Sequence, residues 1–137
     1  MGKIKVIELD HIVLNVSDID RSLKFYSEVL GLKGERVDEF YAGKVSFPSV
    51  RINQQTIIDL FPRKEVAARS TAEKANANLN HFCLVVGAED FSGIVDYLSA
   101  NQVKVHQGPV SRWGAQGRAT SVYFSDPDGN EVEIRCY

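Results

Sequence analysis

Two stretches of the chain decide how it folds: Glu8-Leu-Asp-His-Ile-Val-Leu-Asn-Val16 and Asn78-Leu-Asn-His-Phe-Cys-Leu-Val-Val86. They align at a constant offset of 70 residues, which places His11 over His81. Self-similarity at a fixed offset is typical of a duplicated structural unit. In both stretches every second residue is apolar and shares one face, as in a strand with one buried face: Ile12, Leu14 and Val16 in the first, and Phe82, Leu84 and Val86 in the second. The repeat therefore predicts two equivalent strands that open two equivalent modules.

A helix is expected after each of these strands. The first spans residues 17–30, with Ser17 or Asp18 as its N-cap and Gly31 in the left-handed position that ends it. The second spans residues 89–100, and Gly93 weakens it relative to alanine. Its apolar residues recur at helical spacing and predict a stripe that packs on a sheet: Phe91, Ile94, Val95 and Leu98.

Short β-like runs follow each helix, at residues 44–47 and 56–61 in the first half and 103–105, 121–124 and 131–136 in the second. The turn Asp126-Pro-Asp-Gly129 suits a tight connection between the last two strands. The order strand, helix, further strands predicts an α+β fold of two tandem βαβββ modules. We expect one domain over residues 1–137, with module one at about 5–62, a linker at about 63–77 and module two at about 78–137.

Side chains alternate between the two faces of a strand, so parity decides which residues can converge. In the first strand Leu14 and Val16 share the face expected under a helix, and His11 shares the opposite one. The same rule places four potential metal ligands on the faces away from the helices: His11, Asp59, His81 and Glu133. If those faces line one concave mixed sheet with the helices outside it, the four side chains can meet.

Two imidazoles with one or two carboxylates suit a divalent transition metal and leave coordination positions open. His11, His81 and Glu133 are the predicted ligands, and Asp59 is a further candidate. Ni, Co, Zn, Mn and Fe all fit this donor set. His106 has no partner in the repeat and is expected at the surface.

Composition and charge exclude several classes of binding partner and cellular location. The net charge is −2 with acidic and basic residues interspersed, so the basic stripe of a nucleic-acid-binding protein is missing. The N-terminal residues lack the apolar core of a signal peptide, and no stretch has the length needed to span a bilayer. We expect a cytoplasmic protein with no membrane or nucleic-acid partner. Cys83 and Cys136 are expected to be buried thiols rather than a disulfide.

The motifs together resemble the vicinal oxygen chelate superfamily, which includes glyoxalase I, extradiol dioxygenases and the fosfomycin- and bleomycin-resistance proteins. The resemblance rests on His11 with the helix that follows it, on His81, and on Asp126-Pro-Asp-Gly-Asn130 leading to Glu133. It covers almost the whole chain and is closest to glyoxalase-domain-containing proteins of unassigned substrate.

The resemblance implies metal ligation by His11, His81 and Glu133, a homodimer, and a small-molecule substrate that binds the metal through two neighbouring oxygens. A glyoxalase-type lyase or isomerase is the leading expectation, with Glu133 or Asp59 moving a proton. Asp59 stands where glyoxalase I often has Glu, and it is one methylene shorter. The alternatives are an Fe(II) ring-cleaving dioxygenase and a non-catalytic protein that binds a small molecule such as an antibiotic.

The segment Gly108–Arg118 is left with two interpretations. It contains Arg112, Trp113 and Arg118, which suit a cover over an anionic or thiol-conjugated substrate. It is equally typical of an exposed connection within a hairpin.

Overall fold

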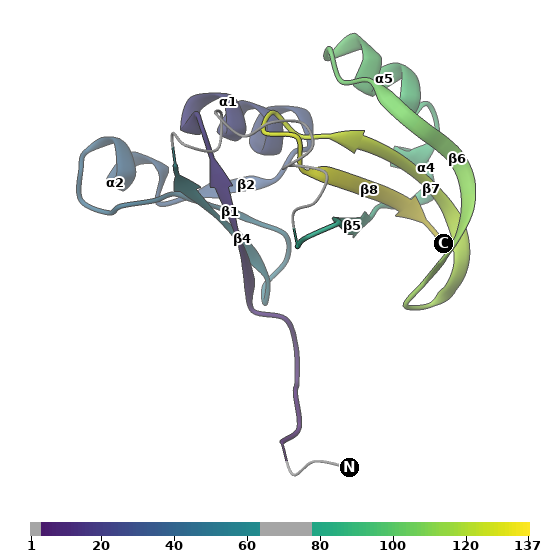
Figure 1. The fold of residues 1–137 in the computed structure, drawn as a ribbon, viewed down its shortest axis with the longest axis horizontal. Helices are drawn as coiled ribbons and strands as arrows, with labels where there is room; N and C mark the ends of the chain where they lie inside the picture. Colours follow the sequence, from purple (N-terminus) through teal and green to yellow (C-terminus); the bar gives the residue numbers. More distant parts are fainter. Residues whose placement is uncertain (1–3, 64–77) are drawn as a thin grey trace. The chain divides into compact units, whose positions relative to one another are not determined.

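The computed structural model describes residues 4–63 and 78–137. The chain divides into two compact units, unit one (residues 1–68) and unit two (residues 69–137). Each unit holds its own four-stranded mixed sheet and its own helices, as Figure 1 shows. The predicted α+β class and the duplication into two modules are thus confirmed.

Unit one begins with a strand and a helix, and β1 then pairs in parallel with the last strand of the unit. The remaining pairs are antiparallel, and the strand order is β1-β4-β3-β2. The elements are β1 (His11–Val16), α1 (Ile19–Leu23), the π-helix η1 (Lys24–Val29), β2 (Lys33–Glu35), α2 (Val37–Tyr41), β3 (Ser49–Arg51) and β4 (Ile57–Pro62).

Unit two repeats this topology, with strand order β5-β8-β7-β6 and a parallel pair between its first and last strands. Each unit therefore places its opening strand directly beside its closing strand. The elements are β5 (His81–Val85), α4 (Ala88–Phe91), α5 (Ile94–Ala100), β6 (Val105–Gly114), β7 (Gly117–Ser125) and β8 (Glu131–Cys136).

The first predicted helix is present, and its ends agree with the sequence signals. The Asp18 side chain accepts a hydrogen bond from the Arg21 backbone N–H at 3.1 Å, and Gly31 has φ +74°. The helix is not α-helical throughout, because Lys24–Val29 winds as a π-helix in which the Leu30 N–H bonds the Phe25 carbonyl at 3.0 Å.

The second predicted helix is two helices, so the expectation of one continuous helix over residues 89–100 is wrong. The first segment ends at Ser92, whose backbone is extended, and Gly93, with φ +73° in the left-handed region, is the N-cap of the second. Ile94 and Leu98 are buried as predicted. Val95 is 37% exposed, so it does not belong to the packed stripe.

Three of the predicted strand assignments need correction. Residues 44–47 form no strand, and β3 instead starts at Ser49, directly after Pro48. The strand expected at 103–105 runs over Val105–Gly114, and the strand expected at 121–124 runs over Gly117–Ser125. Residues 108–118 therefore form the paired ends of two long strands around a two-residue turn at 115–116, which agrees with the interpretation as an exposed hairpin, while the interpretation as a cover over a substrate stays a prediction.

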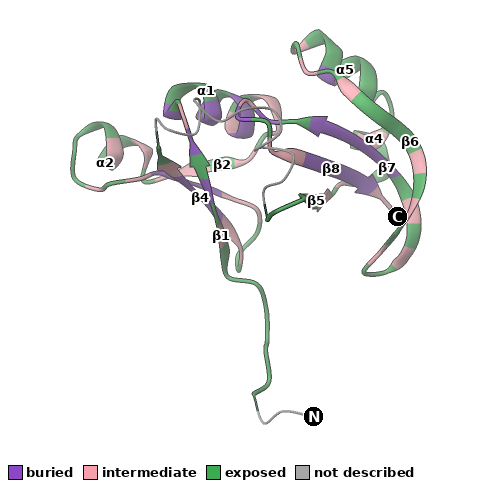
Figure 2. Cartoon of the chain, in the orientation of Figure 1, coloured by how far each residue is buried: buried purple, intermediate pink, exposed green. Residues whose placement is uncertain are grey.

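The parity argument holds in both sheets. Leu14 and Val16 are buried in β1 while His11 and Val13 are exposed, and α1 lies against β4 on the apolar face. Strands β4, β7 and β8 depart from this pattern, because consecutive residues on both of their faces are buried, as the purple of β7 and β8 in Figure 2 shows. Glu133 and Arg135 are 4% and 3% exposed, so the polar face of β8 is covered.

Two expectations lie outside what the structure describes. The linker predicted at 63–77 falls almost entirely outside the described residues. The expectations of a single domain and of one concave sheet both depend on how the two units lie relative to each other, and both stay predictions. No helix among residues 4–63 and 78–137 is long and apolar enough to cross a membrane.

Candidate metal centre

Glu133 lies at the centre of a row of side chains that crosses the sheet of unit two. It pairs in register with Cys83 on β5 and with Tyr123 on β7. Residues paired in register point to the same face of a sheet. His81 precedes Cys83 by two residues on β5 and therefore lies on that face too.

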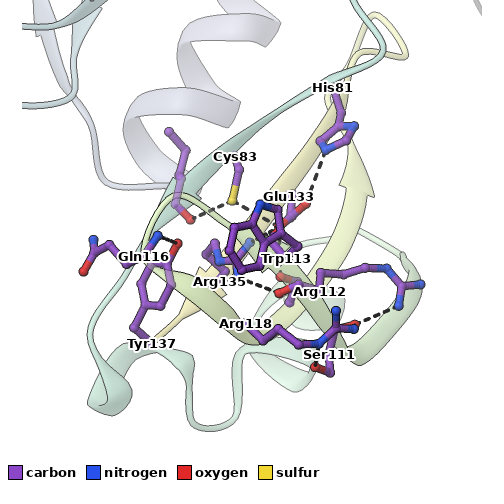
Figure 3. A network of polar contacts seen from close by, with 12 residues as sticks. His81, Cys83, Ser111, Arg112, Trp113, Gln116, Arg118, Glu133, Arg135 and Tyr137 are labelled. Carbon is purple, nitrogen blue, oxygen red and sulfur yellow. Dashed lines mark hydrogen bonds and ion pairs between the residues drawn. The ribbon is translucent and has the colours of Figure 1, made fainter. Parts of the chain in front are cut away.

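The two carboxylate oxygens of Glu133 have different partners (Figure 3). Oε1 lies 3.3 Å from Nε2 of His81. Oε2 accepts hydrogen bonds from the Ser121 hydroxyl at 2.9 Å, the Cys83 thiol at 3.3 Å and the Arg135 guanidinium at 3.4 Å. Three donors thus hold one oxygen, and the other faces the histidine.

The environment keeps Glu133 ionised. Burial alone would raise the pKa of Glu133, but hydrogen bonds from Tyr123, Ser121 and Cys83 together with the nearby His81 hold that pKa below its ordinary value. The donors stay protonated, because desolvation and the neighbouring carboxylate raise the pKa values of Cys83 and Tyr123 each to about 12. Cys83 is therefore a hydrogen-bond donor at neutral pH and not a thiolate nucleophile.

In both predicted histidine ligands, Nδ1 contacts a side-chain oxygen of the preceding residue. Nδ1 of His81 lies 2.6 Å from Oδ1 of Asn80, and Nδ1 of His11 lies 2.7 Å from Oδ2 of Asp10. Both oxygens are acceptors, so an imidazole that holds a metal through Nε2 would keep its proton on Nδ1 and donate it to this oxygen. A hydrogen bond of this kind on the far ring nitrogen is the usual support of a metal-bound histidine.

Unit one has a matching carboxylate at the matching place. Asp59 pairs in register with Val13 on β1, just as Glu133 pairs with Cys83 on β5. Asp59 is 7% exposed, and its Oδ1 accepts a hydrogen bond from the Ser49 hydroxyl at 2.6 Å. The pKa of His11 is raised, chiefly by the hydrogen bond to Asp10 and to a smaller degree by the charge of Asp59.

The structure thus brings His81 and Glu133 together in unit two and places His11 and Asp59 on one face of the sheet in unit one. Within the described part of either unit, no three His, Cys, Asp or Glu side chains gather in a way that could hold a metal ion. A centre of His11, His81 and Glu133 takes ligands from both units and stays a prediction.

Sequence reasoning missed several residues of this network and misplaced one. Cys83 was expected to be buried, yet it is exposed on the ligand face, and Cys136 is half-buried. Both are free thiols, as expected. Asp10 and Asn80 precede the two histidines at the repeat offset, a signal that would have revealed them. His106 is exposed, as predicted, and pairs with Glu131 at 2.7 Å.

Comparison with known proteins defines the class. The sequence profile of the Glyoxalase/Bleomycin resistance protein/Dioxygenase superfamily matches residues 8–134, and the chain belongs to that superfamily. It is 33% identical to the virulence protein STM3117 of Salmonella typhimurium over 130 residues, covering 94% of this chain and 83% of that protein.

Two further similarities concern proteins whose names state an activity. The chain is 27% identical to the metallothiol transferase FosB of Staphylococcus epidermidis over 133 residues, 95% of this chain and 82% of FosB. Its fold matches the crystal structure of a glyoxalase/dioxygenase from Nostoc punctiforme with a TM-score of 0.77 and 28% identity, covering 98% of both chains.

Proposed function

We propose that this protein is a metal-dependent enzyme of glyoxalase type, a lyase or isomerase that acts on a small molecule bound through two neighbouring oxygens. His11, His81 and Glu133 hold the divalent ion. The observation that carries this proposal is the shared arrangement of the two histidines. Each has Nδ1 bonded to an acceptor on the preceding residue and presents Nε2 on the ligand face of its strand.

The donor set suits the metal proposed. Two neutral imidazole nitrogens and one ionised carboxylate oxygen fit Ni, Co, Zn, Mn or Fe in the divalent state. When bound, such an ion acts as a Lewis acid that stabilises negative charge developing on the substrate oxygens. The protein's own part is to keep Glu133 ionised and oriented through Ser121, Tyr123 and Cys83.

Asp59 is the proposed proton-transfer group. Its carboxylate is nearly buried, and the Ser49 hydroxyl occupies Oδ1 at 2.6 Å. Such a contact fixes the orientation of the carboxylate and directs Oδ2 as the proton acceptor. A base positioned in this way contributes roughly 10²–10⁴-fold to a proton-transfer rate.

Two other reactions remain in competition. Similarity to the metallothiol transferase FosB favours transfer of a thiol to an electrophile at the same centre. Two histidines and one carboxylate with open positions also suit Fe(II) and ring cleavage by oxygen. The third alternative is a non-catalytic protein that only binds its small molecule, in which His81 and Glu133, with Nε2 and Oε1 3.3 Å apart, would form a structural pair.

One experiment separates these reactions. The protein is stripped with a chelator, reloaded with one metal at a time and assayed with three probes: the hemithioacetal of a 2-oxoaldehyde and a thiol, a catechol, and a thiol with an epoxide. We expect solvent deuterium in the product of the first probe and no oxygen uptake. Oxygen uptake with the catechol, or thiol consumption with the epoxide, would replace the proposal. No turnover of any probe by a metal-loaded protein would favour simple binding.

A further inference from the structure

Arg135 is a buried cation in unit two whose hydrogen bonds reach from Glu133 to the far end of the β6–β7 hairpin. Its side chain is 4% exposed. Nη2 donates to the carbonyls of Arg112 at 2.8 Å and Gly117 at 3.2 Å. Nη1 donates to the carbonyl of Trp113 at 3.0 Å and to Oε2 of Glu133 at 3.4 Å. Four acceptors therefore match the four Nη hydrogens of the guanidinium.

The hairpin is shaped to receive this guanidinium. A Cβ added at Gly114 would overlap Nη1 and Cζ of Arg135, so only glycine allows the strand to pass over the cation. The Tyr137 ring lies under the guanidinium at 4.8 Å, and its hydroxyl accepts a hydrogen bond from the Gln116 N–H at 3.0 Å. The tip of the hairpin is thus fastened to the end of β8 at several points (Figure 3).

The same contacts decide which oxygen of Glu133 remains for a metal. Arg135, Ser121 and Cys83 all donate to Oε2, whereas Oε1 faces His81. A carboxylate whose second oxygen is held by three donors is oriented to bind through the first oxygen alone. The planar fork of arginine can hold the hairpin carbonyls and the carboxylate at once, which a lysine ammonium cannot do with the same geometry.

We propose that Arg135 is a positioning residue that orients Glu133 as a one-oxygen metal ligand and makes the tip of the β6–β7 hairpin a supporting part of the metal centre. This inference rests on the proposed function, since it needs Glu133 to be a ligand. It assigns to the hairpin a role that reaches the metal through Arg135 rather than through a side chain of its own.

The test measures Zn²⁺ affinity by calorimetry in the wild type, Arg135→Lys, Arg135→Gln and Gly114→Ala. Support of a metal ligand by an outer partner is typically worth about 10–100-fold in metal affinity. We expect a loss of that size in all three variants. Gly114→Ala tests the proposal most sharply, because it changes neither the two histidines nor Glu133 nor Arg135 as residues, while its added Cβ displaces the Arg135 guanidinium. Gln116→Ala is the matched control, since its exposed side chain contacts none of these groups in Figure 3, and its affinity should equal that of the wild type.

A second readout follows the hairpin itself. Trp113 is the single tryptophan of the chain and is 76% exposed, so its fluorescence anisotropy reports the motion of the hairpin tip. We expect lower anisotropy in the Arg135 variants and in Gly114→Ala. Lower anisotropy with unchanged Zn²⁺ affinity would overturn the proposal and leave Arg135 as an anchor of the hairpin only.

The outcomes separate this inference from the proposed function. A wild type that binds no Zn²⁺, Ni²⁺ or Co²⁺ contradicts the metal centre itself. A wild type that binds Zn²⁺ while Arg135→Lys and Gly114→Ala bind it equally well contradicts only the role of Arg135. Circular dichroism identifies any variant that fails to fold, and if Arg135→Gln does so, Gly114→Ala carries the test.

Discussion

Asp59 on β4 and Glu133 on β8 occupy equivalent positions in the two sheets. Each pairs in register with the residue two places after a repeat histidine, Val13 after His11 and Cys83 after His81. Each also has a hydroxyl donor, Ser49 for Asp59 and Ser121 for Glu133. The duplication has therefore preserved a histidine and a carboxylate in both units, and the carboxylates differ in length by one methylene.

The first prediction concerns Asp59. In a glyoxalase-type enzyme Asp59→Asn removes the proton acceptor while keeping the hydrogen bond from Ser49 possible, so kcat should fall by roughly 10²-fold or more. Steady-state kinetics with the metal-loaded protein measure this. In a dioxygenase the three remaining ligands suffice, and Asp59→Asn would keep both its metal and its oxygen uptake. Full proton-transfer activity in the variant would remove Asp59 from the mechanism.

A second prediction concerns pH and the pair Glu35–Arg51. The Arg51 guanidinium donates two hydrogen bonds to Glu35 and holds the pKa of that carboxyl below its ordinary value. Because the folded state favours the ionised form, this contribution to stability is present above the unfolded pKa and disappears as pH falls through the lowered folded pKa.

Glu35→Gln should therefore be less stable than the wild type near neutral pH, and the difference should vanish in acid. Urea unfolding at a series of pH values between neutral and strongly acidic measures it. A stability difference that stays constant across the series would show that the pair contributes nothing through its charge.

The third prediction tests the corrected description of the second helix. Leu98 is 1% exposed and Val95 is 37% exposed on the same helix, α5. Leu98→Ala should cost about 2–5 kcal/mol in unfolding free energy, because it leaves a cavity. Val95→Ala should change that free energy by about 0.5 kcal/mol or less, as exposed positions do. If urea denaturation shows that both variants lose the same unfolding free energy, Val95 packs together with Leu98, as the sequence predicted.

A fourth prediction is a homodimer, which rests on the resemblance to the superfamily. Sedimentation at micromolar concentration should show two chains, and a monomer would contradict the expectation. Mixed dimers of His11→Ala and Glu133→Ala chains then distinguish two arrangements. A centre built between chains regains one metal ion per mixed dimer, whereas a centre built within one chain regains none.

Local patterns predicted a large part of this fold. The repeat predicted β1 and β5, and strand parity predicted that Leu14 lies on the buried face and His11 on the opposite one. The Asp126–Gly129 turn forms with the expected hydrogen bond, from the Gly129 N–H to the Asp126 carbonyl at 3.0 Å. These features depend on residues that are neighbours in the sequence, which is why the sequence alone reveals them.

The features that were missed depend on single backbone conformations or on distant contacts. Helical spacing continues through Gly93, so the pattern could not show that this residue turns left-handed. Arg135 alternates with apolar residues and is typical of a solvated position. It is buried only because a hairpin more than fifteen residues earlier in the sequence lies over it and supplies three carbonyls.

Metal content of the purified, reloaded protein tests the central claim most directly. Elemental analysis should find one divalent ion per wild-type chain, the same amount in His106→Ala, and none in His81→Ala, while circular dichroism shows that both variants keep their fold. His106 is the matched control, because it also faces a glutamate, Glu131, at 2.7 Å. A stoichiometric metal ion in folded His81→Ala, or a metal-free wild type, would contradict the account.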